Sequence, residues 1–177
     1  MILELLQRVC TSLDDISVPY MISGSIAMNI YTIPRMTRDI DIVVELTANR
    51  VDEFTALFPD SYFNRDVIIE EIKRQGMFNI IDHQTGFKID FIVRKETDYF
   101  IQAFENRQRI YELETNLWVI SIDDLIIAKI IWIQDYQSEK QMMDIENLLL
   151  HPNVNMDYIN NWCDKMELHT YNLLDNE

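Results

Sequence analysis

Glycine, proline and cysteine are all scarce in this chain of 177 residues, which has three glycines, four prolines and two cysteines. Collagen-like repeats, low-complexity fibres and flexible Gly/Ser linkers are therefore excluded. Cys10 and Cys163 lie far apart in the sequence and lack the C-x-x-C spacing of metal or redox motifs. We interpret them as two buried thiols of a protein that is kept in a reducing compartment.

Positive charge is also in short supply, because 15 basic residues face 30 acidic ones and the formal net charge is −15 at pH 7. A chain this acidic lacks the general basic surface that neutralises nucleic-acid phosphates, and anionic membranes repel it. No apolar run reaches the roughly 18 residues of a membrane helix, and the first residues lack the basic segment of a signal peptide. We therefore expect a cytoplasmic protein with no membrane partner.

Apolar and charged residues make up 48% and 25% of the chain, which is typical of a globular domain with its own core. Hydrophobic periodicity predicts helices over 2–15, 25–33, 47–57, 66–75, 97–106, from 121 onward, 138–150 and 155–166, and strands over 20–23, 38–45, 77–82, 87–93, 108–112 and 116–120. The expected fold class is α/β (α+β), with a small mixed β-sheet core over residues 1–120. A C-terminal helical unit, residues 121–177, is expected to pack on that core.

Several turn and cap signals support these boundaries. Gly86 supplies the positive φ that a four-residue hairpin loop needs between the strands 77–82 and 87–93. Ser121 followed by Asp124, and Ser138 followed by Gln141, resemble capping boxes that open two C-terminal helices. Thr47 is the expected cap of a third helix.

The first chemical signal is Gly24-Ser25, which lies between a predicted strand and a predicted helix. Such a turn lets backbone N–H groups face an anion, and the helix N-terminus adds a partial positive charge. Small residues mark many ordinary turns, so the pair alone leaves a phosphate loop and a plain turn both open.

Asp39 and Asp41 form the second signal, because residues two apart in a strand point to the same face. Two carboxylates this close on a buried strand raise one carboxyl pKa unless a cation lies between them. A divalent metal ion suits oxygen ligands of this kind. A solvated strand end, with one surface aspartate and one capping aspartate, is the alternative.

Asp90 adds a third carboxylate, inside the apolar return strand of the hairpin. A buried carboxylate without a partner costs several kcal/mol, so three aspartates on neighbouring buried strands are hard to explain structurally. A site for two Mg²⁺ (or Mn²⁺) ions explains them. Three carboxylates against two divalent ions leave a charge of +1, which favours a phosphorylated ligand.

The order Gly24-Ser25, Asp39-x-Asp41 and Asp90 resembles the nucleotidyltransferase superfamily of the DNA polymerase β type. The stretch over residues 35–42 resembles its small prokaryotic branch, which contains AbiEii-like abortive-infection proteins and minimal nucleotidyltransferase toxins. The likeness extends over about residues 18–150. It implies a nucleotidyltransferase fold, metal ions held by the three aspartates, and an NTP as substrate.

The resemblance also implies that Lys129 and Asp144, on two C-terminal helices, complete the site. Lys129 is then a phosphate-binding cation, and the alternative is a lysine that snorkels from the edge of the core. Asp144 has an alternative role as the surface partner of Lys140, four residues earlier. Arg35 and Arg38 flank the turn before the aspartate strand, where a guanidinium can reach a phosphate or pair with an aspartate.

These features predict an enzyme that transfers NMP from an NTP to a hydroxyl of an RNA 3′ end, a protein or a small molecule. The resemblance adds the role of a toxin, with a cognate antitoxin as partner. The acidic charge favours a small or protein acceptor, or RNA docked on a patch of Arg35, Arg38, Lys73 and Arg74. Two alternatives remain open: a non-catalytic binding partner with this fold, and an antibiotic-modifying nucleotidyltransferase.

Overall fold

The computed structural model of the protein describes residues 2–112 and 114–175. Within them one mixed sheet has the strand order β3-β4-β5-β2-β1-β7-β6. The strands are β1 (Tyr20–Ser23), β2 (Asp39–Val44), β3 (Ser61–Tyr62), β4 (Met77–Asp82), β5 (Lys88–Val93), β6 (Gln108–Glu112) and β7 (Thr115–Val119). Every strand predicted from the sequence is present, and the predicted α/β fold class is confirmed.

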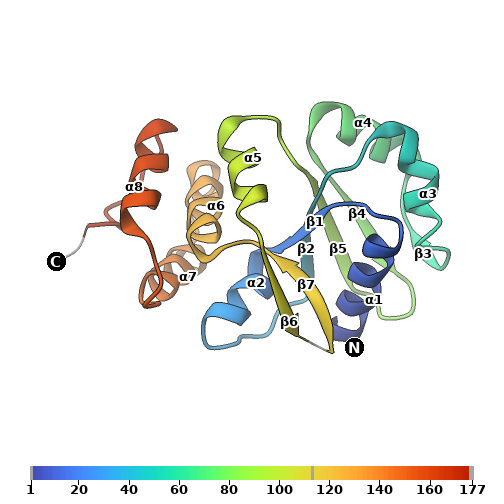
Figure 1. Ribbon diagram of the computed structural model, residues 1–177, viewed down its shortest axis with the longest axis horizontal. Coiled ribbons are helices and arrows are strands. Elements are labelled where there is room, and N and C mark those ends of the chain that lie inside the picture. Colours follow the sequence, from blue (N-terminus) through green and yellow to red (C-terminus); the bar gives the residue numbers. More distant parts are fainter. Residues whose placement is uncertain (1, 113, 176–177) are drawn as a thin grey trace.

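The helices flank this sheet and continue beyond it toward the C-terminus (Figure 1). They are α1 (Ile2–Asp15), α2 (Gly24–Tyr31), α3 (Val51–Thr55), α4 (Arg65–Arg74), α5 (Asp98–Glu105), α6 (Ile122–Asp135), α7 (Glu139–Leu149) and α8 (Met156–Lys165). In Figure 1, α6, α7 and α8 gather at one end of the molecule, and α1, α3 and α4 lie at the other end. None of the described helices is long and apolar enough to cross a membrane.

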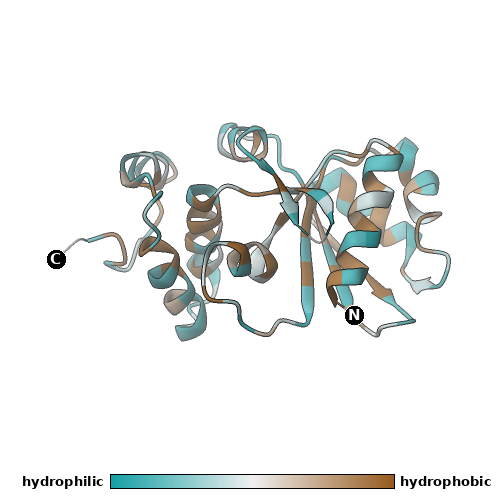
Figure 2. Cartoon of the chain, turned by 60° about the horizontal axis from the view of Figure 1, so that its bottom comes forward, coloured by the Kyte–Doolittle hydropathy of each residue, from teal (hydrophilic) through white to brown (hydrophobic). Residues whose placement is uncertain are grey.

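The two central strands, β2 and β5, run parallel. Their buried side chains are mostly β-branched or aromatic, as is typical of strands in the interior of a sheet. Ile40, Ile42, Ile89 and Phe91 are fully buried. Figure 2 shows hydrophobic stretches along α6, and hydrophobic bands next to hydrophilic ones on the central strands. The carboxylates of Asp41 and Asp90 are thus held on the two central strands of the sheet.

Helix α6 contacts α2, α7 and α8, so it links the sheet side of the molecule to the C-terminal helices. Its N-cap follows the sequence prediction, because the Ser121 side chain accepts a hydrogen bond from the backbone N–H of Asp124. The Asp124 carboxylate is fully buried and accepts hydrogen bonds from Ser121, Asn106 and Tyr158. This network stabilises the position of α6 against α5 and α8.

Three local predictions were wrong. Ser138 precedes α7 but makes no side-chain cap, and Thr47 makes none either. The helix expected over 47–57 is a 3₁₀ turn, Ala48–Arg50, followed by the short α3. Strand β3 was not predicted, because two residues are too few to show a hydrophobic period.

Candidate active site

Asp41 on β2 and Asp90 on β5 are directly opposite each other in the parallel register, and Asp39 is opposite Lys88. Since residues two apart in a strand share a face, all four side chains lie on one face of the sheet. The structure thus brings together the three aspartates that the sequence singled out. Lys88, which the sequence analysis did not use, lies among them.

Lys88 neutralises part of this acidic cluster. Its Nζ lies 2.6 Å from Oδ2 of Asp90 and 4.0 Å from Oδ1 of Asp39. The other carboxylate oxygen of Asp90, Oδ1, is buried and has no hydrogen-bond partner among the described residues. Burial, and after it the charges of Asp90 and Asp39, raise the pKa of Asp41 above its ordinary value. The cluster is therefore short of positive charge.

The turn before α2 lies directly against the carboxylate of Asp41. Gly24 has a φ of +60°, and a Cβ at this position would overlap the Asp41 carboxyl group. Only glycine satisfies both conditions without strain. Ser25 follows in the first turn of α2, so its hydroxyl and the helix N-terminus lie next to the aspartates.

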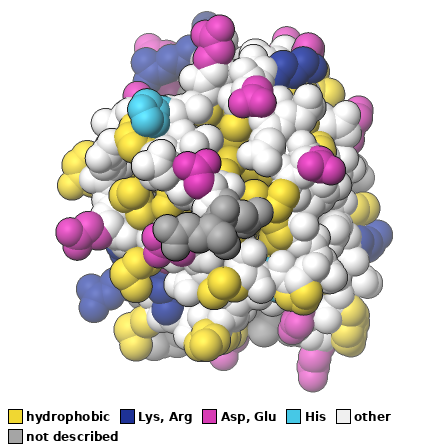
Figure 3. All heavy atoms as spheres, turned by 90° about the vertical axis from the view of Figure 1, so that its left-hand side faces the viewer, with side chains coloured by type: hydrophobic (Ala, Val, Ile, Leu, Met, Phe, Trp, Pro, Cys, Tyr) yellow, Lys and Arg dark blue, Asp and Glu magenta, His cyan; other side chains and the backbone are white. Residues whose placement is uncertain are grey.

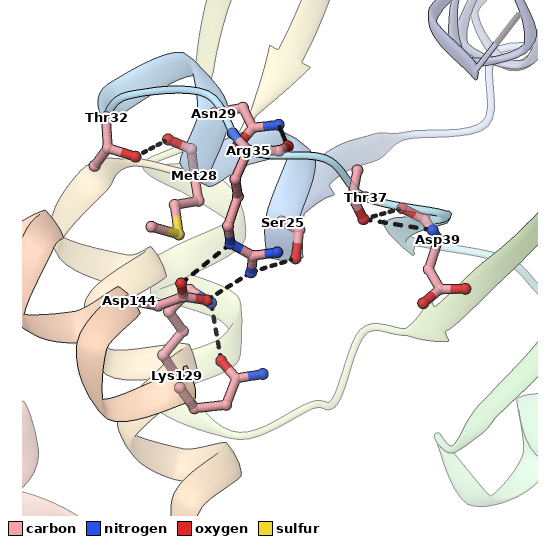
Figure 4. Close-up of polar contacts among 10 residues, drawn as sticks. Ser25, Met28, Asn29, Thr32, Arg35, Thr37, Asp39, Lys129 and Asp144 are labelled. Atoms are coloured by element: carbon pink, nitrogen blue, oxygen red, sulfur yellow. Dashed lines mark hydrogen bonds and ion pairs between the residues drawn. The ribbon is translucent and has the colours of Figure 1, made fainter. Parts of the chain in front are cut away.

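A second cluster joins Arg35 and Ser25 to the C-terminal helices (Figure 4). The Arg35 guanidinium donates to Asp144 through Nε (3.2 Å) and an Nη (2.8 Å), and that Nη also donates to the Ser25 hydroxyl at 3.0 Å. Lys129 donates to Asp144 at 2.9 Å and to Gln141 at 3.0 Å. Side chains from the loop after α2, from α6 and from α7 thus meet at one carboxylate.

This geometry argues against the two structural alternatives for Lys129 and Asp144. Lys129 is 6% exposed and does not snorkel to solvent, and Asp144 is 3% exposed and does not pair with Lys140. Burial opposes ionisation of Asp144, but hydrogen bonds from Arg35 and Lys129 hold its pKa below the ordinary value. Burial lowers the pKa of Lys129 despite the ion pair. The two clusters are neighbours, because Arg35 donates to Ser25 and the adjoining Gly24 lies against the Asp41 carboxylate.

The basic patch that the sequence offered as one way to dock RNA is not formed. Arg38 is exposed and makes no hydrogen bond or ion pair with another described residue, whereas Arg35 is held by Asp144. Lys73 and Arg74 lie at the end of α4, just before β4 begins. The first residue of β4 is opposite Ile92, whereas Asp39 is opposite Lys88 at the other end of β5. Arg74 is also paired with Glu71. The four residues therefore make no common surface.

No described group of three or more His, Cys, Asp or Glu side chains is already arranged as a metal site. The carboxylates of Asp41 and Asp90 nevertheless offer oxygen ligands, and Oδ1 of Asp90 has no hydrogen-bond partner in the described part of the chain. Two hollows, of about 300 Å³ beside His151 and about 390 Å³ beside Trp162, lie elsewhere and include none of these residues.

Comparison with known proteins relates this geometry to one family. A family model described as "Nucleotidyltransferase of unknown function (DUF6036)" matches residues 1–177. A search of curated proteins gave no match.

Solved structures share the fold at low sequence identity. The crystal structure of ANT(2″)-Ia in complex with adenylyl-2″-tobramycin has a TM-score of 0.64 and 11% identity, covering 93% of this chain and 95% of that chain. JHP933 from Helicobacter pylori has a TM-score of 0.56 and 15% identity, covering 93% and 72%. An antigenic nucleotidyltransferase-like protein from Paracoccidioides brasiliensis has a TM-score of 0.52 and 16% identity, covering 93% and 88%.

These matches support the superfamily that the sequence resembles, and none of them supports the AbiEii-like branch in particular. The chain belongs to the nucleotidyltransferase family whose model spans its whole length, and it is a transferase of the EC 2.7.7 type.

Proposed function

We propose that the chain transfers a nucleoside monophosphate from an NTP to an acceptor hydroxyl and releases pyrophosphate. The observation that carries this proposal is the pairing of Asp41 with Asp90 on the central strands, with the Gly24-Ser25 turn packed against Asp41. A non-catalytic binding module has no need to keep three carboxylates on one face of its sheet. Their repulsion in the metal-free protein favours an enzyme.

We propose Asp39, Asp41 and Asp90 as the ligands of two divalent ions, Mg²⁺ or Mn²⁺. The partnerless Oδ1 of Asp90 and the raised pKa of Asp41 both fit a site that is completed by a cation. The chemistry that such ions supply is neutralisation of the phosphate charge and activation of the attacking hydroxyl. The residues of the chain hold and orient the reactants for an in-line attack on the α-phosphorus.

The triphosphate is proposed to lie against the N-terminus of α2, where Gly24 and Ser25 present backbone N–H groups and a hydroxyl. Arg35 and Lys129 supply positive charge on the adjoining side, and Asp144 positions both of them. In this proposal residues 1–120 form the catalytic core. The C-terminal helical unit, which begins at residue 121, contributes Lys129 and Asp144 to the same site.

A small molecule with a free hydroxyl is the acceptor that we favour. Lys88, Arg35 and Lys129 are all paired with carboxylates, so the site offers little free positive charge to a long RNA. Figure 3 views the end of the molecule that carries α7 and α8, where acidic side chains are spread among hydrophobic ones and basic side chains lie near the edges. The likeness to ANT(2″)-Ia, whose structure contains adenylyl-2″-tobramycin, points in the same direction.

A toxin of a toxin–antitoxin pair, acting in the cytoplasm on an RNA end or a protein hydroxyl, is the second candidate. It is favoured by the contact of Lys129 with Asp144, since the resemblance to the toxin branch implies these two positions. Growth arrest on induced expression, absent with Asp41→Asn, is the expected result for a toxin. Unimpaired growth with the active wild-type protein would reject this role.

The acceptor class is tested by incubating the protein with each α-³²P-labelled NTP, Mg²⁺ or Mn²⁺, and cell extract separated into RNA, protein and small-molecule fractions. Asp41→Asn is the matched control, because it keeps the side-chain volume and removes the charge. We expect label in the small-molecule fraction with the wild type alone. Label in the RNA or protein fraction reassigns the acceptor, and equal label with Asp41→Asn refutes the proposed function.

A further inference from the structure

Lys88 is the one charged side chain among the three aspartates that the proposed function leaves without a role. It lies on β5, two residues before Asp90 and opposite Asp39. Its ammonium is 2.6 Å from Oδ2 of Asp90 and 4.0 Å from Oδ1 of Asp39. Nothing in the packing of the sheet requires a lysine here, because 41% of its side chain is exposed.

The charges around Lys88 do not balance. Three carboxylates and one ammonium sum to −2 within the cluster, and Oδ1 of the buried Asp90 has no hydrogen-bond partner among the residues that the structure describes. The single ammonium therefore covers only one side of the most buried carboxylate. The ammonium also lies where it would strongly repel a divalent ion bound by Asp41 and Asp90.

We propose that Lys88 is a displaceable counter-ion, whose ammonium holds Asp90 in the metal-free protein, leaves that carboxylate when a divalent ion binds, and thereby weakens binding of the free ion. The proposal rests on the proposed function, because it takes Asp41 and Asp90 as the metal ligands. The exposed four-carbon stem of Lys88 lets the ammonium move without disturbing the strand. Lys129, which is only 6% exposed, has less freedom to move.

A consequence concerns the order of binding. When the ion arrives with a nucleotide, the phosphates give the displaced ammonium a new negative partner, and the repulsion between lysine and metal is offset. Lys88 therefore disfavours the free ion more than it disfavours the metal–nucleotide complex. The residue acts through the charge of the site, and we class it as a positioning residue.

The test measures Mn²⁺ binding to the full chain by electron paramagnetic resonance of the free ion. We compare the wild type with Lys88→Met, and use Lys73→Met on the exposed end of α4 as the matched control. We expect Lys88→Met to bind Mn²⁺ about tenfold more tightly, because a competing charge-assisted hydrogen bond is removed. Lys73→Met is expected to match the wild type. With Mn²⁺ and a non-hydrolysable NTP together, the gain from Lys88→Met is expected to shrink.

Unchanged or weaker Mn²⁺ binding by Lys88→Met would overturn the proposal, as would the absence of Mn²⁺ binding to both proteins. Lys88→Arg keeps a cation and is expected to retain the wild-type affinity, and Lys88→Gln replaces the methionine variant if that fails to fold. If Lys88 were purely structural, its replacement would lower the thermal midpoint of unfolding and leave the Mn²⁺ affinity unchanged. If nucleotide transfer depends on Asp41 but Lys88→Met leaves the Mn²⁺ affinity unchanged, only the role of Lys88 is refuted. If Lys88→Met binds Mn²⁺ more tightly but the protein transfers no nucleotide, only the proposed function is refuted.

Discussion

The guanidinium of Arg35 holds both carboxylate oxygens of Asp144, although 109 positions separate the two residues in the chain. The pair joins the loop after α2 to α7, and Lys129 of α6 reaches the same carboxylate. Charged hydrogen bonds, partly buried for Arg35 and buried for Lys129, therefore fasten the C-terminal helices to the element that carries Ser25. Such bonds contribute more to the free energy of unfolding than surface ion pairs do. Removing one partner leaves the other charge buried without compensation, which is destabilising.

Arg35→Met is expected to lower the free energy of unfolding at pH 7 by about 1.5–3 kcal/mol, the usual value of a hydrogen bond to a charged group. The pKa of Asp144 is held below its ordinary value of 3.8, so the stabilisation exists above that pH and is lost as the pH falls through the lowered pKa. Urea unfolding at several pH values checks this, with the exposed Arg38→Met as control. A deficit that stayed constant down to pH 2 would contradict the assignment.

Gly24→Ala is expected to destabilise the protein more than Gly86→Ala. Both glycines have positive φ, so each alanine costs about 1–2 kcal/mol of backbone strain. A Cβ at position 24 also overlaps the Asp41 carboxylate, whereas a Cβ at position 86 meets nothing within 4 Å. This overlap is expected to lower the free energy of unfolding of Gly24→Ala by a further amount of about 1–3 kcal/mol. Chemical unfolding of both variants measures the difference, and equal losses would show that the turn is not packed against Asp41.

Asp41→Asn is expected to abolish transfer, by at least about 100-fold, while stabilising the metal-free protein. The pKa of Asp41 is raised, so the stability associated with its protonated form is complete below pH 3.8 and lost as the pH rises through the raised pKa. The asparagine variant should therefore exceed the wild type in thermal midpoint at pH 7 and match it below pH 3.8. A variant less stable than the wild type at pH 7 would count against a repulsive carboxylate cluster.

Lys129→Met keeps the apolar stem of the buried lysine and removes its charge. If Lys129 contacts the triphosphate, affinity for a non-hydrolysable NTP with Mg²⁺ should fall about 10- to 150-fold, the equivalent of one charged hydrogen bond. Asp144 keeps its two bonds from Arg35, so the fold should persist. Isothermal titration measures the affinity, and Lys140→Met on the exposed side of α7 is the control. Unchanged affinity would limit Lys129 to holding α7 in place.

Much of the fold followed from local pattern. The alternation in β2, the hairpin around Gly86 and the cap at Ser121 each depend on neighbours within a few residues, and each was confirmed. The convergence of Asp41 and Asp90 was expected from two aspartates in apolar strands. Their direct opposition needed the register of a parallel pair, which no local pattern contains.

The ion pairs of the site were harder to predict. The contact between Arg35 and Asp144 depends on how α7 packs, and an arginine beside an aspartate strand offered several partners. Lys88 had a usable signal, because it precedes Asp90 by two residues and therefore shares its face. The patch of Arg35, Arg38, Lys73 and Arg74, which was one option for docking RNA, does not form because the length of the sheet separates the first two residues from the last two.

The central claim is that Asp41 and Asp90 together hold divalent ions beside a triphosphate bound at the Gly24-Ser25 turn. Anomalous scattering from crystals of the wild-type protein grown with Mn²⁺ and a non-hydrolysable NTP tests it most directly. We predict manganese peaks bound by carboxylate oxygens of Asp41 and Asp90, with the triphosphate at the N-terminus of α2 and Lys88 turned away from Asp90. A triphosphate bound elsewhere, or manganese peaks that do not contact these two aspartates, would contradict the account.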